Sequence, residues 1–147
     1  MSGLRIERVD GSGEDLLRDW LYVHNLIVPP DALSLADVRE RAGRHRLDVA
    51  HRGDVLVGCS TVRPPTADGP ATVIARMLPE HRRQGLGTQL YAHALAEARR
   101  LGADVIETVV LESNEDGLRF ALARGYVEVE RCLLPGDSIP YVDLRLA

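Results

Sequence analysis

The chain has 147 residues, of which 45% are hydrophobic and 27% charged, a composition typical of one globular domain with a single core. The formal net charge of -4 excludes the broad positive field that collects nucleic acid or an anionic membrane surface. All 18 basic residues are arginine, and the absence of lysine excludes a Walker A phosphate loop and a Schiff-base lysine.

The first residues, MSGLRIERVD, are charged early and have no apolar core, so they do not resemble a secretory signal. No apolar run approaches the roughly 18 residues of a membrane span. The histidines and cysteines show no metal-ligand spacing. We therefore expect a cytoplasmic protein with no metal site and with neither membrane nor nucleic-acid partners.

The apolar pattern changes period along the chain and predicts an α/β fold. In chain order the predicted elements are a strand at 4–9, helices at 14–27 and 34–43, two strands joined by a Gly53-Asp54 turn within 45–65, a strand at 72–78, a helix at 86–101, a strand at 104–112, a helix ending at Arg124, and a closing hairpin of 126–134 with 139–146. The near-continuous apolar run at 104–112 predicts a strand covered on both faces. Ser113 followed by Asp116 predicts a capping box. We expect a mixed central sheet of about seven strands with about four helices.

The most informative segment joins the strand at 72–78 to the helix at 86–101. Its residues HRRQGLG place Arg82 and Arg83 before two glycines at a helix N-terminus. Such an N-terminus has unpaired backbone N–H groups, and glycines let an anion approach them, so a pyrophosphate is the natural ligand. The Rossmann pattern GxGxxG fails because Leu90 stands at its third glycine. A plain tight turn flanked by a solvated arginine pair is the competing interpretation.

The segment MLPEHRRQGLG, residues 77–87, resembles the coenzyme A pyrophosphate loop of the GNAT superfamily of N-acyltransferases. In that family a strand ends in V-x-P-x-x-R and is followed by x-x-G-x-G/A and a long helix. Asn114, followed by GLRFALARGY at 117–126, resembles the second family motif. The resemblance covers the whole chain and implies one GNAT-like domain, residues 1–147, whose central strands splay apart.

The resemblance implies acetyl-CoA as co-substrate. Backbone amides from Arg83 to Thr88 would bind its pyrophosphate, and a free N–H at Met77 or Leu78 would polarise the thioester carbonyl as an oxyanion hole does. Asn114 would hold the coenzyme from the other side of the splay, although it also suits a plain helix cap. The implied coenzyme-binding residues are Met77, Leu78, Arg82, Arg83, Gln84, Gly85, Leu86, Gly87, Thr88 and Asn114.

The residues that transfer protons are less clear. Many family members have a tyrosine four residues before the Gly-aromatic pair, where this chain has Ala121. Tyr141 and Tyr126 are the candidate acids, with burial in the core as the competing interpretation for Tyr126, and Ser113 is a further candidate. Glu107, a carboxylate in an otherwise apolar strand, is the candidate general base unless that strand is exposed.

In the family the acceptor pocket forms from the first two helices, their connection and the closing hairpin. The first of these segments offers Tyr22, His24, Asn25 and Asp31, and a carboxylate there suits a cationic amine. Arg76, a charge on the central strand, suits instead an acceptor carboxylate or a strand neighbour. These signs conflict, so the identity of the acceptor stays open.

We expect an N-acetyltransferase that moves an acetyl group from acetyl-CoA directly to a primary amine of a small molecule. The alternative is a GNAT-fold acyl-CoA-binding module with little or no turnover, which Ala121 and the absence of a carboxylate on the strand at 72–78 would favour. The closing hairpin could pair across the axis of a homodimer.

Overall fold

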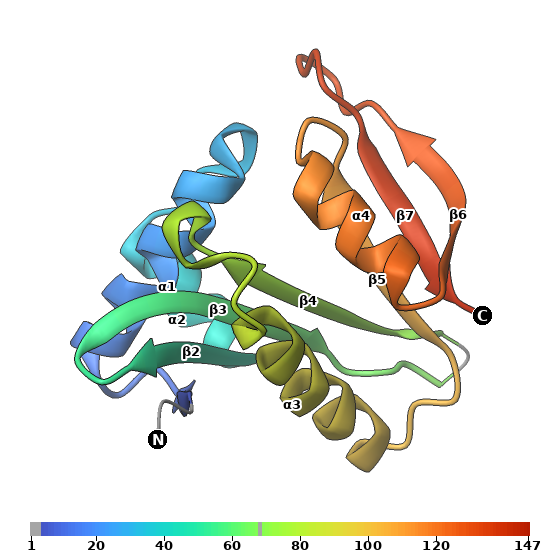
Figure 1. The fold of residues 1–147 in the computed structure, drawn as a ribbon. Helices are drawn as coiled ribbons and strands as arrows, with labels where there is room; N and C mark the ends of the chain where they lie inside the picture. The colour runs from blue at the N-terminus through green and yellow to red at the C-terminus, as the bar shows by residue number, and fades with distance from the viewer. Residues whose placement is uncertain (1–3, 68) are drawn as a thin grey trace.

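A seven-stranded mixed sheet organises the chain in a computed structural model that describes residues 4–67 and 69–147 (Figure 1). The strands are β1 (Arg5–Val9), β2 (Arg46–Arg52), β3 (Val55–Arg63), β4 (Ala71–Met77), β5 (Ile106–Leu111), β6 (Tyr126–Cys132) and β7 (Tyr141–Leu146). The helices are α1 (Glu14–Ile27), α2 (Leu35–Ala42), α3 (Leu86–Arg100) and α4 (Glu115–Ala123), with the short 3-10 helices η1 (Pro29–Asp31) and η2 (Pro79–His81). The predicted α/β class and element order are confirmed.

The central strands β4 and β5 separate along most of their length. The strand order is β1-β2-β3-β4-β5-β7-β6, and all neighbouring strands are antiparallel except β4 and β5. These two pair only where Ala71 faces Ile106 and Thr72 faces Glu107. Beyond that point they diverge, which confirms the predicted splay and leaves strand edges open in the middle of the sheet.

Helices cover the sheet on two faces, with α1 and α2 on one and α3 and α4 on the other (Figure 1). The core under α1 and α2 contains Val9, Leu17, Trp20, Val23, Val38, Leu47, Val49 and Cys59. The core under α3 and α4 contains Val73, Ala94, Ala98, Ile106, Ala121, Tyr126, Val142 and Leu144. Burial of these apolar side chains is the main favourable term in folding, and it holds β4 and β5 in one sheet although they barely pair.

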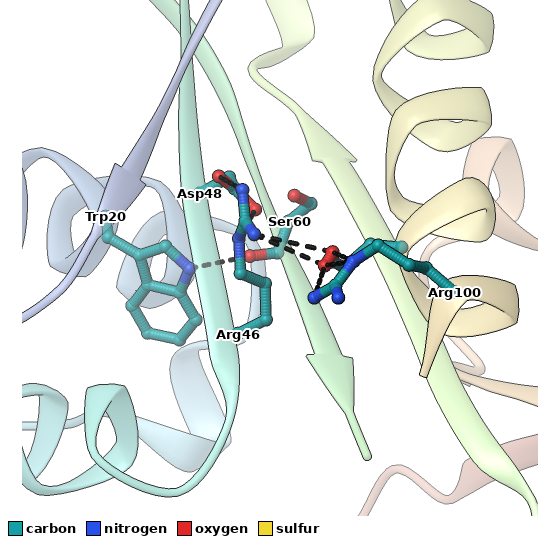
Figure 2. Close-up of polar contacts among 6 residues, drawn as sticks. Trp20, Arg46, Asp48, Ser60 and Arg100 are labelled. Carbon is teal, nitrogen blue, oxygen red and sulfur yellow. Dashed lines mark hydrogen bonds and ion pairs between the residues drawn. The ribbon is translucent and has the colours of Figure 1, made fainter. Parts of the chain in front are cut away.

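A cluster of four charges, of which Asp48 and Glu97 are buried, joins β2 to α3 (Figure 2). Arg46 donates to the two carboxylate oxygens of Asp48 at 3.0 and 3.1 Å and to Glu97 of α3 at 3.4 Å. Arg100 donates to Glu97 at 2.6 to 3.0 Å, and these bonds hold the pKa of Glu97 below its usual range. Asp48 is only 1% exposed. Every charge in this cluster therefore has a partner within the chain.

Two local predictions are wrong. Helix α4 is capped by Asn114, whose Oδ1 accepts a hydrogen bond from the Gly117 N–H at 3.0 Å, so Ser113 and Asp116 form no capping box. Strand β5 is not fully covered on both faces, because Ile106, Thr108 and Leu111 are buried whereas the three residues between them are half-buried. Glu107 belongs to the half-buried set.

Candidate functional site

A cleft of about 450 Å³ passes through the splay between β4 and β5, a size suited to a small ligand. One end, here called the loop end, reaches Gly85 before α3, and the other, the α1 end, reaches Arg76 and Tyr141 beside the end of α1. Met77 packs with α3, whereas Cys59, the register partner of Arg76, packs under α1 and α2. The cleft therefore connects the two faces of the sheet.

The loop before α3 carries backbone donors without acceptors. Arg83 has a φ of 63° and Gly85 a φ of 79°, so two left-handed residues bend the chain into the helix. Among the described residues, the N–H groups from position 83 to 88 have no acceptor, and the first bond of the helix runs from Gln89 to the Gly85 carbonyl at 3.4 Å. Unsatisfied N–H groups at a helix N-terminus bind anions. Gly87 allows close packing on β4, since a Cβ there would lie 3.3 Å from Met77 Cγ.

The two arginines of the loop have different environments. Arg82 donates through Nε to the Met77 carbonyl at 3.0 Å and through Nη1 to Asp116 of α4 at 3.1 Å. The bond from Arg82 is the main reason that the pKa of Asp116 is lowered. Arg83 has a side chain that is 78% exposed, with Nη2 3.7 Å from Asp116. Arg82 therefore braces the loop against α4, and Arg83 stays in solvent beside the unpaired N–H groups.

The β4 edge of the splay supplies further backbone groups. The Ala71 N–H donates to the Val105 carbonyl at 3.0 Å, and alternation along the strand turns the backbone groups of Met77 to the same side. The Leu78 N–H instead donates to the Val57 carbonyl at 2.8 Å. Of the two N–H groups predicted as a free donor, only that of Met77 faces the cleft.

The predicted coenzyme-binding residues do not all reach the cleft. Those that line it are Met77, Arg82, Arg83, Gly85, Gly87, Thr88 and Asn114. Leu86 is buried in the core with Leu90, and the Gln84 side chain accepts from Arg52 Nη1 at 3.1 Å. The Asn114 Oδ1 is used by the α4 cap, while Nδ2 has no partner among the described residues.

The candidate proton-transfer residues differ in their surroundings. Tyr126 is 3% exposed, and its oxygen accepts a hydrogen bond from the Tyr91 hydroxyl at 3.1 Å. Burial, and then that bond, raises the pKa of Tyr126. Tyr141 lines the α1 end, has no hydrogen-bond partner among the described side chains, and has a pKa raised by burial. Glu107 lies outside the cleft and accepts from Arg145 Nε at 2.9 Å, so the structure does not bring it to the site.

Among the predicted acceptor-binding residues, Arg76 lines the cleft, but His24 and Asp31 do not. His24 is 2% exposed and stacks on Trp20 with ring centroids 5.0 Å apart. Burial, with Arg76 as the next cause, lowers the pKa of His24 from 6.5 to about 4. Asp31 lies 3.3 Å from His24 Nε2 and 3.6 Å from Arg41. His24 and Asp31 thus belong to the packing behind the cleft.

The remaining acceptor predictions also fall outside the cleft. Asn25 donates to the Leu33 carbonyl at 3.0 Å and accepts from the Leu33 N–H at 2.9 Å, so it fixes the connection between α1 and α2. Tyr22 is 57% exposed on α1. The end of α1 instead contributes Ile27 and the C-cap residue Val28 to the cleft wall, which makes this part of the wall apolar.

Sequence reasoning missed Asp116 and Tyr91 as cleft residues. Asp116 accepts a hydrogen bond from Arg82, which lies 34 positions away, and Tyr91 donates one to Tyr126, which lies 35 positions away. Pairings between distant segments leave no local pattern. The one available signal for Asp116 was its place in the first turn of α4, and that turn was attributed to a capping box.

In the described ranges 4–67 and 69–147, no group of three or more histidine, cysteine or acidic side chains gathers as a metal site. None of the described helices combines the length and apolar character needed to cross a bilayer. A second, open hollow on α1 is lined by Arg18, Tyr22 and Leu26, with other residues of the same helix.

The sequence matches the acetyltransferase (GNAT) family over residues 13–126, which is most of the chain. The fold is similar to that of a proposed acetyltransferase from Salmonella typhimurium with its cofactor acetyl-CoA, at 17% identity, coverage of 98% of this chain and 93% of the other, and a TM-score of 0.72. A Bacillus subtilis acetyltransferase in complex with CoA is 24% identical, with 97% of each chain covered and a TM-score of 0.69. A GNAT family acetyltransferase from Elizabethkingia anophelis with acetyl-CoA bound is 15% identical, with 99% of each chain covered and a TM-score of 0.70. No curated protein matches the sequence.

Proposed function

The chain belongs to the acetyltransferase (GNAT) family, and on this premise we propose that it transfers an acetyl group from acetyl-CoA directly to the primary amine of a small molecule. One observation carries the proposal: the cleft runs through the splayed sheet from an anion-binding loop on one face to Arg76 and Tyr141 on the other. A donor held at the loop end and an acceptor entering at the α1 end would meet between β4 and β5. Residues 1–147 would act as one domain.

In this proposal the loop holds the coenzyme pyrophosphate. The free N–H groups from position 83 to 88 and the positive end of the α3 dipole offset its charge. Gly85 leaves the approach open, because a Cβ there would have no other atom within 4 Å. The backbone groups of β4 that face the splay would pair with the extended pantetheine arm of the coenzyme. Asn114 Nδ2 would donate a hydrogen bond to the coenzyme from the opposite wall of the cleft.

Acetyl-CoA supplies an activated thioester, and the chain supplies orientation and proton transfer. The Met77 N–H faces the cleft and would donate to the carbonyl oxygen as negative charge develops there. Tyr141 would donate the proton to the departing sulfur, since Ala121 stands at the usual tyrosine position and Tyr126 is engaged by Tyr91. Among the described lining residues, the only carboxylate that could act as a general base is Asp116, and its carboxylate is already bonded to Arg82. We therefore assign removal of the amine proton to water.

The test of this function is free thiol release from acetyl-CoA across a broad panel of primary amines. Acceptor-dependent thiol release, with the acetylated amine confirmed by mass spectrometry, is the expected result. Saturable coenzyme binding without acceptor-dependent thiol release would contradict it and identify an acyl-CoA-binding module, the function that Ala121 would favour. The coenzyme should bind in either case, so calorimetry with CoA tests the loop separately.

The loop assignment is tested by a matched pair of variants, Gly85→Asp and Gly85→Asn. Both side chains tolerate left-handed backbone better than most residues, and neither Cβ would clash, so both variants should fold. Only Asp places a negative charge at the pyrophosphate. We expect Gly85→Asp to weaken CoA binding more than about a hundredfold and Gly85→Asn to weaken it much less. Equal CoA affinities for the two variants would show that the pyrophosphate does not bind at this loop.

A further inference from the structure

Arg76 is a charged side chain in the cleft wall without a partner in the described chain. It is half-buried on β4 and lines the α1 end of the cleft. No hydrogen bond or ion pair joins its guanidinium to another described residue, whereas Arg46, which is also half-buried in the sheet, has two carboxylate partners. Burial is the first cause that lowers the pKa of Arg76, which means that its charge is poorly solvated.

The neighbouring charges do not neutralise Arg76. The carboxylate that acts on the pKa of Arg76 is Asp31, which already lies 3.6 Å from Arg41 and 3.3 Å from His24. His24 is neutral near pH 7 because its pKa is about 4. Arg63, half-buried at the end of β3, adds a second positive charge and likewise has no ion pair in the described chain. The α1 end therefore has an excess of positive charge.

The position of Arg76 separates it from the coenzyme loop. Cys59, its register partner, packs in the core under α1 and α2, so Arg76 points to that face of the sheet. Its neighbour Met77 points to the other face, where it packs with Leu86 and Leu90 of α3. An anion bound by Arg76 would thus belong to a molecule that enters from the α1 end, and not to the pyrophosphate.

We propose that the acceptor is a small amine that also carries an anionic group, such as the carboxylate of an amino acid, and that Arg76 binds this group with support from the charge of Arg63. The inference rests on the proposed function and names its substrate class. Arg76 and Met77 are adjacent on β4, so an anion held at Arg76 and an amine directed at the splay fit within one compact molecule. A guanidinium recognises a carboxylate with two parallel hydrogen bonds, which also orients the amine.

The first test compares matched acceptors in the thiol-release assay. Each amino acid is paired with its amide, which preserves size while removing the negative charge, and with the smaller amine that decarboxylation produces, which lacks the carboxylate altogether. The amine of an amide is less basic and more often neutral, so intrinsic reactivity favours the amide. We nevertheless expect kcat/KM to be about tenfold to a hundredfold higher for the carboxylates, the range expected for a charge-assisted hydrogen bond.

The second test uses Arg76→Gln and Arg76→Lys, with Arg39→Gln as the matched control. Arg39 is an exposed arginine on α2, so its variant removes the same charge outside the cleft. Arg76→Gln should lower kcat/KM for carboxylate acceptors about tenfold to a hundredfold while changing the amides and decarboxylated amines less than about threefold. Arg76→Lys should recover part of the loss, because lysine keeps the positive charge but cannot form the two parallel hydrogen bonds of a guanidinium. CoA affinity should be unchanged in all three variants.

The outcomes separate the two proposals. A carboxylate preference that disappears in Arg76→Gln supports the inference. Equal rates for carboxylates and their uncharged counterparts, or an equal loss for every acceptor in Arg76→Gln, would overturn it and leave the acetyltransferase assignment standing. Thiol release with none of the acceptors, in a protein that binds CoA, would overturn the proposed function and this inference together.

Discussion

Arg46 and Arg76, two half-buried arginines of the sheet, lie in contrasting surroundings. At the junction of β2 and α3, the Arg46 guanidinium has two carboxylate partners, Asp48 and Glu97. Arg100 forms a further ion pair with Glu97 (Figure 2). Around Arg76, in the wall of the cleft, the guanidinium has no partner in the described chain. Unpaired buried charge is unfavourable and rarely occurs without a reason. The first region therefore serves the fold, and the second is available to a ligand.

Removing Arg46 should produce the largest change in stability. Arg46→Ala would leave Asp48, which is 1% exposed, without its only charged partner in the described chain. Breaking one side of a buried pair costs about 3–5 kcal/mol, and urea unfolding measures it directly. Arg76→Gln is the comparison, because it removes a charge that has no partner and should leave the free energy of unfolding unchanged or slightly higher. Similar losses in the two variants would show that the contrast between the regions is false.

Acid should destabilise the region around Arg76 through His24. The folded-state pKa of His24 is about 4, below its ordinary 6.5. As pH falls through this window the unfolded chain takes up a proton that the folded chain does not, so the free energy of unfolding decreases, by up to about 3 kcal/mol. The contribution is fully present above about pH 6.5.

The measurement is urea unfolding from about pH 7 to about pH 4, for the natural chain and for His24→Gln. Carboxylates titrate in both proteins, so the informative quantity is the difference between them, which should shrink as pH falls. If the difference in free energy of unfolding between the two proteins stays constant over this range, His24 does not take up the proton on unfolding. Arg76→Gln should reduce the effect, because the charge of Arg76 is the second cause of the lowered pKa.

The loop end of the cleft could be predicted because its parts are contiguous in sequence. The strand, Gly85, Gly87 and the helix follow one another within residues 72–101, so local periodicity and glycine spacing place them together. The order of strands and helices was predictable for the same reason. Ser113 and Asn114 are both good capping residues, and the sequence offers both as caps of α4 without deciding between them; the structure shows that Asn114 is the cap.

The α1 end could not be predicted because residue type does not reveal a partner. Glu107 has the chemistry of a general base, but Arg145, 38 positions later, engages its carboxylate. His24 and Asp31 have the chemistry of an acceptor site, but α1 and η1 place them behind the cleft wall. Arg76 was identified as an acceptor-binding candidate, and only the structure shows that the described chain provides it with no counter-charge.

The same contrast applies to two tyrosines. Tyr126 shares a hydrogen bond with Tyr91, whereas the Tyr141 hydroxyl is unpartnered among the described side chains and lines the cleft. Tyr141→Phe should lower kcat for acetyl transfer about a hundredfold, the lower end of the range for general acid catalysis, with little change in CoA affinity. Tyr126→Phe is the matched control and should cost about 1 kcal/mol of stability with little loss of kcat. Loss of kcat in Tyr126→Phe alone would move the acid to the Tyr91 and Tyr126 pair.

Asn114 has one partnered and one unpartnered polar atom in the same side chain, and its variants should have small effects on stability. Its Oδ1 caps α4 through the Gly117 N–H, while Nδ2 has no partner among the described residues. Asn114→Asp keeps a cap acceptor and suits the helix dipole, so it should retain stability, whereas Asn114→Ala should lose about 1 kcal/mol. Both variants lack the free donor, and calorimetry should find weaker CoA binding in both. If Asn114→Asp binds CoA normally, Nδ2 makes no contact with the coenzyme. Asn114 would then have only a structural role as the cap of α4, as Arg46 has in joining β2 to α3.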